Sequence, residues 1–316
     1  MTAILSAGAR PMTPDLISDW TADKADSFGR ETVQFRHGLH ERPMFSDEGL
    51  IEVLDRYPRE KLGVFTMGDD PVEWRTWRRG TAAGLSGAQL MEAVNTGRIW
   101  LNLREVNSVM ESYGDLAREI FGDIEAHTGT RTFRHDLGLL ISSPNAQVFY
   151  HLDATPVTLW QIRGQKKMWV YPRAAPFVTP EEIERIVLRE TAEQFAYRPE
   201  WDTSAQVVDM VPGVMVSWPQ NAPHRLVNGP MVNVSLSIEY LTPAALMRAN
   251  LLYANGVMRR RLGARPRLSD GYSPSNLAKF GIARAAKALK LQKDVATKAA
   301  PSFKLEPARP GEIAAI

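Results

Sequence analysis

The sequence predicts a mainly β core, an antiparallel sandwich or barrel, with helical segments before and after it. Between Gly138 and Tyr240, short runs of β-branched and aromatic residues alternate with Pro and Gly, which is typical of strands. Outside this region apolar residues recur at helical spacing. With 316 residues, 44% of them hydrophobic, the chain can bury a substantial core. We therefore expect residues 1–130 to pack on the core as helices and strands, residues 131–242 to form the core, and residues 243–316 to add basic helices.

The segment before the core begins irregularly, to about residue 30, and then carries two capped helices. Ser46 precedes a run with amphipathic spacing that stops at Pro58. Ser86 and Gln89 form a capping box, which predicts a helix that ends near Gly97. The other predicted elements are strands at 62–67 and 98–103, a Trp-rich turn around Trp74 and Trp77, and one long helix at 106–124.

The core region contains one helical interruption. Thr179 as an N-cap, Pro180 at the first helical position and the acids that follow predict a helix within an insertion at 173–205. Such an insertion is either a lid over a site or a packing helix. The predicted strands lie at 139–142, 148–153, 158–163, 167–171, 206–210, 214–218 and 232–238.

Two helices are predicted after the core. The first begins at Thr242 and runs to the basic triplet Arg259, Arg260 and Arg261, and the second lies near 275–292. The final 20 or so residues are predicted to be frayed. An apolar stripe on the first helix favours a homodimer formed through these helices over simple packing of the helices against the barrel. The stripe consists of Leu246, Leu251, Tyr253 and Val257.

Charge is distributed unevenly along the chain. Residues 251–316 hold 13 Lys and Arg against 4 Asp and Glu, whereas the whole chain has a net charge of only +2. A basic tail of this kind is either a solvated helix face or a contact for nucleic acid or phospholipid. We favour the solvated face.

Cysteine is absent from the chain, which excludes disulfides and thiolate metal sites and leaves histidine and carboxylates as metal ligands. No apolar run approaches the length of a membrane span, and the first residues lack the pattern of a signal peptide. We therefore expect a soluble cytoplasmic protein.

A histidine and an aspartate, His151 and Asp153, lie two positions apart in a predicted strand, and His224 follows in a second apolar run. Because strand side chains alternate, residues 151 and 153 face the same way. Two histidines and one carboxylate are the ligand set of non-haem iron(II) centres with open positions. The H-x-D pattern alone is uninformative, since chance predicts about one such triplet in a chain of this composition.

In its ordered motifs, the segment 139–240 resembles the Jumonji-C and cupin-like oxygenases, most closely the asparaginyl-hydroxylase-like protein hydroxylases. The shared features are HLD at 151–153, QIRGQK ending at Lys166, a strand ending in VYP, PxxxxH ending at His224, and SLSIEY at 235–240. The resemblance implies a double-stranded β-helix, of the jelly-roll type, over about a third of the chain.

The resemblance also implies a function. It places His151, Asp153 and His224 on the family's catalytic metal triad and Lys166 on the lysine that pairs with the distal carboxylate of 2-oxoglutarate. The expected enzyme is an iron(II)- and 2-oxoglutarate-dependent dioxygenase that uses O2. It would hydroxylate a protein side chain or a small metabolite, or demethylate it, while 2-oxoglutarate is converted to succinate.

Two positions depart from the pattern of the best-studied members. Val148 and Val157 stand where those members carry a threonine and an asparagine that bind the cosubstrate, and valine donates no hydrogen bond. Other groups must therefore bind the cosubstrate, and Thr158, Ser237 and Asn233 are the candidates. Trp100 and Asn102, on the strand expected to form the pocket wall, are candidates for binding substrate, although a tryptophan in a strand is usually part of the core.

Other interpretations remain open at this point. A non-oxidative cupin enzyme such as an isomerase would use the metal as a Lewis acid only, and a non-catalytic cupin-like protein would bind through its basic helices. Lys166 argues against the isomerase, although its alternative interpretation, next to Lys167, is a residue of a solvated turn. The sequence does not identify the substrate. For His37, His40, His127 and His135 we expect structural roles, and for Trp160, Trp169 and Trp218 core positions.

Overall fold

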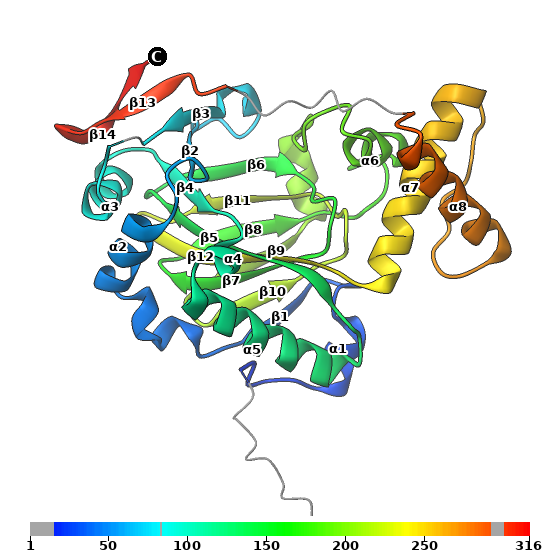
Figure 1. Ribbon diagram of the computed structural model, residues 1–316, viewed down its shortest axis with the longest axis horizontal. Coiled ribbons are helices and arrows are strands. Elements are labelled where there is room, and N and C mark those ends of the chain that lie inside the picture. The colour runs from blue at the N-terminus through cyan, green and yellow to red at the C-terminus, as the bar shows by residue number, and fades with distance from the viewer. Residues whose placement is uncertain (1–15, 83, 292–299) are drawn as a thin grey trace, which may run out of the picture.

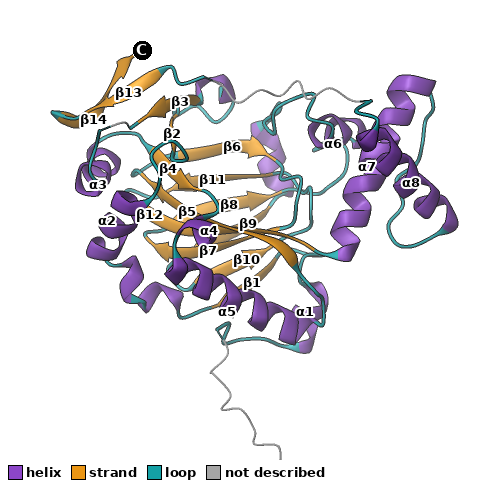
Figure 2. Cartoon of the chain, in the orientation of Figure 1, coloured by secondary structure: helices purple, strands orange, loops and turns teal. Residues whose placement is uncertain are grey.

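The computed structural model describes residues 16–82, 84–291 and 300–316. Two β-sheets face each other at the centre of the molecule, and helices lie along the outer side of the larger sheet and at one end of the molecule (Figures 1 and 2). The larger sheet has the strand order β1-β10-β7-β12-β5-β4-β2-β3-β13-β14, and the smaller has the order β6-β11-β8-β9. The strands are β1 (Val33–Arg36), β2 (Gly63–Thr66), β3 (Arg78–Thr81), β4 (Trp100–Leu103), β5 (Phe133–Ser142), β6 (Gln147–His151), β7 (Val157–Arg163), β8 (Lys166–Val170), β9 (Gln206–Met210), β10 (Val214–Ser217), β11 (His224–Asn228), β12 (Asn233–Leu241), β13 (Phe303–Glu306) and β14 (Arg309–Ala315).

Strands β5 to β12 form a double-stranded β-helix. Along this stretch the chain passes repeatedly from one sheet to the other, so that the larger sheet contains β5, β12, β7 and β10 and the smaller contains β6, β11, β8 and β9. Strands within these two sets pair antiparallel. This jelly-roll order confirms the predicted fold class.

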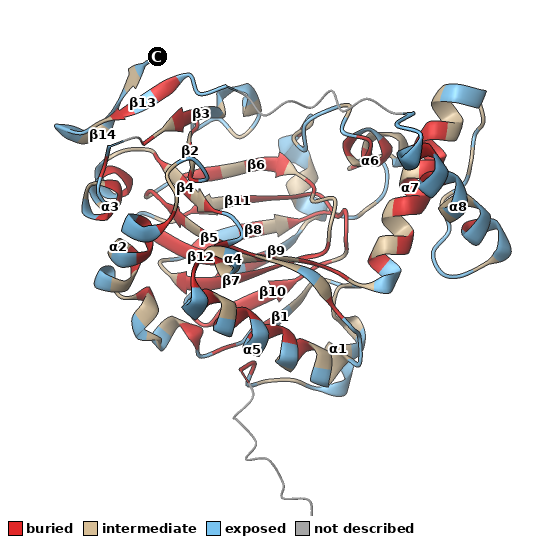
Figure 3. Ribbon diagram, in the orientation of Figure 1, coloured by how far each residue is buried: buried red, intermediate tan, exposed pale blue. Residues whose placement is uncertain are grey.

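Alternating side chains separate the inside of the β-helix from its outer face. On β7, Val157 and Leu159 join an apolar cluster between the two sheets, together with Met168 of β8. Trp160 and Ile162, one position out of phase, join the large cluster on the opposite side of the sheet. The strands of the β-helix therefore have two buried faces, and they are the most continuously buried part of the molecule (Figure 3).

Helices complete the outer layer. The predicted caps are present: Ser46 Oγ accepts a hydrogen bond from the Gly49 N–H, and Ser86–Gln89 and Thr179–Glu182 form capping boxes. Ile120 and Phe121 of α5 pack on the outer face of the larger sheet. The helices are α1 (Ala22–Ser27), α2 (Asp47–Arg56), α3 (Gly87–Thr96), α4 (Val106–Val109), α5 (Glu111–Thr128), α6 (Pro180–Val187), α7 (Pro243–Leu262) and α8 (Pro274–Ala288).

Several sequence-based expectations are wrong in detail. The segment expected to be irregular to residue 30 contains α1, and the helix predicted at 106–124 is divided at Met110, whose backbone is extended. The Trp-rich turn leads directly into β3, which the sequence analysis missed along with β1 and β11. In β11 the alternation is hidden because Arg225 and Asn228 are polar yet buried.

The expectation of a frayed C-terminal end is also wrong for residues 300–316. β13 pairs in parallel with β3 and antiparallel with β14, and Phe303 and Leu305 are buried. Residues 292–299, the rest of that stretch, lie outside the described residues, as do residues 1–15, on which the expectation about a signal peptide rests.

The C-terminal helices pack against their own chain. Leu251 and Val257, two members of the apolar stripe, are buried, and α7 packs against α6 and α8 at the end of the molecule away from β13 and β14 (Figure 1). The stripe is therefore covered within one chain, which removes the basis for the predicted dimer. Arg259 and Arg260 form ion pairs with Glu184 of α6, so two cations of the basic triplet are neutralised internally.

Within the described residues, no helix combines the length and apolar character needed to cross a bilayer.

The Glu184 carboxylate is expected to fix α7 to the insertion. Its side chain is only 1% exposed and lies 3.0 Å from Arg259 and 3.7 Å from Arg260. Replacing one partner of a buried ion pair leaves the other without compensation. Glu184→Ala should therefore lower the free energy of unfolding by about 2–3 kcal/mol in urea titrations. Glu181→Ala, which removes a half-exposed partner of Arg259, should cost about 1 kcal/mol or less; equal losses in the two variants would contradict this role.

Candidate metal centre

A β-bulge brings two histidines together at one end of the β-helix. His151 ends β6 and faces His224 at the start of β11. Between this pair and the pair Leu226–Val148, β6 advances by three residues and β11 by two. The extra residue shifts the alternation of side chains in β6.

The three predicted triad residues converge. Ligand atoms of His151, Asp153 and His224 all lie within 4.8 Å of one another. The His224 Nε2 and Asp153 Oδ2 atoms are 3.4 Å apart, and the two imidazole centroids are 4.2 Å apart. The side chains are half-buried or buried, so the group lies below the surface, as a ligand set for a single cation requires.

Hydrogen bonds orient both imidazoles. His151 Nδ1 donates to the Phe149 carbonyl at 2.7 Å, and His224 Nδ1 donates to the Ala222 carbonyl at 3.1 Å. A proton on each Nδ1 leaves each Nε2 with a free lone pair. Backbone carbonyls thus select the tautomer that binds a metal.

The electrostatics of the triad favour a cation. Burial, followed by the proximity of His151, lowers the pKa of His224 well below its usual range. Burial also raises the pKa of Asp153. Since the site keeps His224 neutral and disfavours an uncompensated carboxylate, a bound cation would relieve the cost of ionising Asp153.

Asn221 secures the loop that carries Asp153. Its Nδ2 donates to the carbonyl oxygens of Asp153, at 2.9 Å, and Ala154, at 3.4 Å. The neighbouring Gln220 Nε2 donates to the same Ala154 carbonyl at 2.8 Å. Asn221 has a φ of +65°, a region that asparagine tolerates better than most residues. Asn221 lies three residues before His224, so the loop that leads into His224 also holds the loop of Asp153 in place.

Lys166 lies in the same interior, at the beginning of β8. Its side chain is buried, and in the described part of the chain its ammonium has no hydrogen-bond or ion-pair partner. Burial lowers the pKa of Lys166 to about 7. The strand alternation that puts Met168 and Val170 inside also puts Lys166 inside. A solvated turn, the alternative for this lysine, is excluded, whereas its neighbour Lys167 is exposed.

Asn233 and Ser235 form a closed polar network near Gln161. Gln161 Nε2 donates to Asn233 Oδ1 at 2.8 Å, and Ser235 Oγ donates to Gln161 Oε1 at 2.8 Å. Asn233 Nδ2 donates to the Met231 carbonyl. Asn233, a predicted cosubstrate residue, is therefore buried on the interior side with its amide already engaged.

Thr158 does not face the interior. Its hydroxyl accepts a hydrogen bond from Trp160 Nε1 at 2.9 Å, on the side of β7 opposite to Val157 and Leu159. The structure therefore contradicts a cosubstrate role for Thr158. Val157 does line the interior, and Val148 packs against the same apolar cluster.

Asn102 and Ser237 meet at Gly138. A Cβ on Gly138 would lie 3.8 Å from Asn102 Oδ1 and 3.9 Å from Ser237 Cβ. Asn102 Oδ1 is buried and has no hydrogen-bond partner among the described residues, which makes it available to a bound molecule. Trp100, on the same face of β4, instead packs against Phe65 and Trp77.

Charged residues that the sequence analysis missed surround Asp153. Arg104 forms 2.8 Å ion pairs with Asp136 and Glu239. Glu193 is exposed as a residue, but partial burial of its carboxyl and the nearby Asp153 raise the pKa of Glu193. Glu193 comes from an irregular loop of the insertion, so no periodicity could have identified it.

The remaining histidines have structural partners. His37 is buried beside Trp160, and burial lowers its pKa to about 4. His127 stacks on Trp20 and His135 on Phe121. His40 lies 6.0 Å from His37, measured between ring centroids. Trp160 and Trp218 are core residues, as predicted, and Trp169 is half-buried beneath Arg225.

Comparison with known proteins yields structural likenesses only. No family model matches the chain, and no curated protein matches it in sequence. It is similar to YcfD of Escherichia coli, with a TM-score of 0.47 and 14% identity over 85% of this chain and 68% of that one. A structure described as the ribosomal oxygenase YcfD with cobalt and 2-oxoglutarate has a TM-score of 0.47 and 15% identity, and the match covers 84% of this chain and 65% of that one. A structure of the same protein with cobalt and succinic acid has a TM-score of 0.43 and 16% identity, with the same two coverages. The chain thus spans about two thirds of the length of these proteins.

Asn221 should contribute to metal affinity through the Asp153 loop. Asn221→Gly tolerates the positive φ but removes both side-chain hydrogen bonds to the loop. We expect the affinity for Co(II), measured by isothermal titration, to fall by about tenfold. Asn145→Gly is the matched control, because Asn145 also has a positive φ and is exposed outside the site. Unchanged Co(II) binding by Asn221→Gly would show that the loop needs no such support.

Proposed function

We propose that the chain is an iron(II)- and 2-oxoglutarate-dependent oxygenase. One observation carries the proposal: the interior of the β-helix has His151, Asp153 and His224 at one end and the buried, unneutralised Lys166 farther along the same interior. A triad alone fits many divalent metals, but a triad combined with a buried cation fits a ligand that is both a metal chelator and an anion at its far end.

The donor set suits iron(II). Two imidazole nitrogens and one carboxylate on one side of an ion leave three positions open. Both Nδ1 atoms are already bonded to carbonyls, so each histidine offers only Nε2. A bound iron(II) would supply the redox chemistry by which O2 oxidises 2-oxoglutarate to succinate and carbon dioxide and a substrate C–H bond to an alcohol.

The spacing between Lys166 and the triad matches the cosubstrate. His224 pairs with Val170, four residues along β8 from Lys166, and four strand residues span about 13 Å. A lysine side chain and a five-carbon dicarboxylate can fill such a span together. A carboxylate on the Lys166 ammonium would compensate a charge that is costly to bury.

Further residues have roles that follow from their positions. We assign to Asn102 and Ser237, which meet at Gly138, contacts to the cosubstrate or substrate inside the β-helix. Asn233 supports this wall through Gln161. Arg104, Glu193 and Glu239 lie close to Asp153, and we assign to them contacts to the substrate, for which protein side chains and small metabolites are both candidates.

The direct test uses the full chain with iron(II) under anaerobic conditions. Addition of 2-oxoglutarate should produce a metal-to-ligand charge-transfer band, and admission of O2 should yield succinate. Lys166→Met should retain the metal but weaken 2-oxoglutarate binding by about 10- to 100-fold, since it removes a charge-assisted hydrogen bond.

Lys167→Met provides the control, because Lys167 is an exposed neighbour that pairs with exposed Asp209 at 3.7 Å, and it should leave binding unchanged. The absence of both the band and succinate from the native chain would refute the proposal. A metal-loaded chain that binds no 2-oxoglutarate would instead favour a Lewis-acid cupin enzyme.

Cosubstrate affinity should also depend on pH through Lys166. Because burial lowers the pKa of Lys166 to about 7, a carboxylate that binds the protonated form must draw a proton onto it at higher pH. The apparent Kd for 2-oxoglutarate should be flat below about pH 7 and rise by up to about tenfold per pH unit above it. Lys166→Arg, whose guanidinium stays protonated, should remove this slope; an identical slope in that variant would assign the effect to another group.

A further inference from the structure

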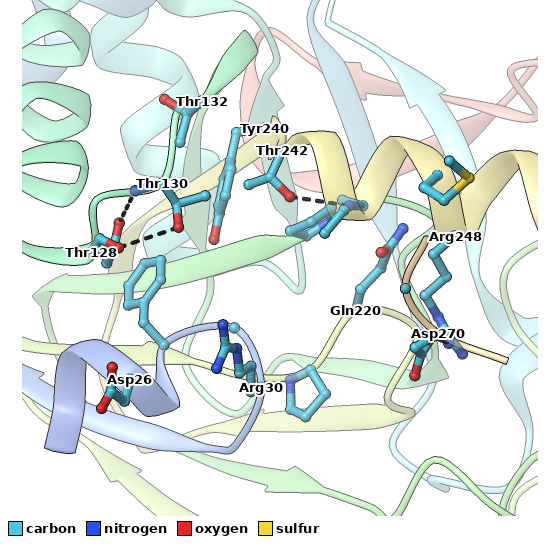
Figure 4. A pocket seen from close by; sticks show the side chains of 18 of the residues that line it. Asp26, Arg30, Thr128, Thr130, Thr132, Gln220, Tyr240, Thr242, Arg248 and Asp270 are labelled. Atoms are coloured by element: carbon cyan, nitrogen blue, oxygen red, sulfur yellow. Dashed lines mark hydrogen bonds and ion pairs between the residues drawn. The ribbon is translucent and has the colours of Figure 1, made fainter. Parts of the chain in front are cut away.

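A separate cavity lies beside the β-helix. Its volume is about 450 Å³; it is lined by α1, the end of α5, the start of α7 and the loop before α8, and it is partly open to solvent (Figure 4). Pro156 and Gln220, which line it, flank the two loops that carry the triad ligands, while the triad itself lies outside the lining. The cavity is therefore distinct from the proposed oxygenase site and does not depend on it.

Two guanidinium groups at one end of the cavity share a single carboxylate. Arg248 Nη1 donates to Asp270 Oδ1 at 2.6 Å, and Arg173 Nη2 lies 3.9 Å from Asp270 Oδ2. The Arg248 side chain is 11% exposed, whereas that of Asp270 is 68% exposed. Burial and the neighbouring Arg248 lower the pKa of Arg173. The arginine pair thus has less negative charge around it than two half-buried cations require.

The rest of the cavity lining combines polar and apolar side chains. Arg30 and Asp26 are the other charged residues in its lining, and Thr128, Thr130 and Thr242 add hydroxyl groups (Figure 4). The first turn of α7, a helix of 20 residues, also contributes to the lining and places the positive end of its dipole there. Apolar surface comes from Phe28, Met247 and Leu251.

We propose that this cavity is a second binding site, for a small organic anion whose carboxylate is bound by Arg173 and Arg248. Asp270 occupies the position of that carboxylate in the free protein. It comes from the irregular segment between α7 and α8 and is held by these two arginines, so a ligand can displace it without disturbing a helix or strand. Two guanidinium groups offer the forked donors that recognise a carboxylate.

The arginines hold their positions through the loop next to the metal centre. Arg248 Nε donates to Asn221 Oδ1 at 3.2 Å, and Arg173 Nη1 donates to the Gln220 carbonyl at 2.8 Å. These bonds preorganise the guanidinium groups for a ligand, since neither depends on Asp270.

The experiment measures anion binding to the full chain by isothermal titration at constant ionic strength. The probes are citrate, for a free carboxylate, and an acetylated, amidated triglutamate, for an acidic peptide. At least one should bind saturably, and the one that binds identifies the source. Arg248→Gln and Arg173→Gln should each weaken binding by about 10- to 100-fold, with circular dichroism verifying that the variants are folded.

Asp270→Asn provides the sharper test, because it should tighten binding by about threefold or more by removing the competing carboxylate. A merely structural Asp270 would give the opposite sign. Lys166→Met and Arg265→Gln, the latter an exposed arginine nearby, should leave binding unchanged. The proposal would be overturned if neither probe bound or if Arg248→Gln bound as tightly as the native chain. It would equally be overturned if Asp270→Asn bound more weakly or if Lys166→Met lost anion binding.

Discussion

The antiparallel pairing of β6 with β11 is the interaction on which the site depends. It places His151 opposite His224, although 72 residues separate them in the sequence, and the bulge in β6 sets the phase of its side chains. The two other contributions are local: Asp153 lies two residues after His151, and Asn221 ties the loop of Asp153 to the segment that leads into His224. A shift of the β6–β11 register by one residue would turn one imidazole to the opposite face of the smaller sheet and separate the three candidate ligands.

The interior shows an electrostatic imbalance that the protein alone does not resolve. Holding Lys166 with a pKa of about 7 instead of 10.5 costs the charged form about 5 kcal/mol, a large share of the stability of an ordinary domain. At the other end, Asp153 is disfavoured as a carboxylate. An anion beside Lys166 would offset the cost of its buried charge, and a cation at the triad would offset the cost of ionising Asp153. Binding of both would therefore relieve both electrostatic costs.

The sequence was sufficient for the fold class, through local strand alternation, and for the three candidate ligands, through the resemblance of its ordered motifs to a known family. The sequence was insufficient where the face on which a strand residue lies, or the residue that it contacts, is set by distant parts of the chain. Thr158 was misassigned because only the three-dimensional ladder shows that Val157 and Leu159 face inward. β11 was missed because Arg225 and Asn228 interrupt its apolar pattern, although both are buried and bond to half-buried Asp202 and buried Ser142, respectively. Glu193 and Arg173 belong to loops without periodicity, and although Arg248 lies on the predicted helix α7, its pairing with Arg173 is non-local.

The parallel pairing of β13 with β3 joins segments that are roughly 220 residues apart in the sequence. During synthesis, β3 emerges from the ribosome long before its neighbour exists, and its outer edge must wait unpaired through the making of the whole jelly roll. Until then the unpaired backbone groups of that edge can form hydrogen bonds with a strand of another chain. The late arrival of a short hairpin thus decides how long the nascent molecule is exposed to aggregation.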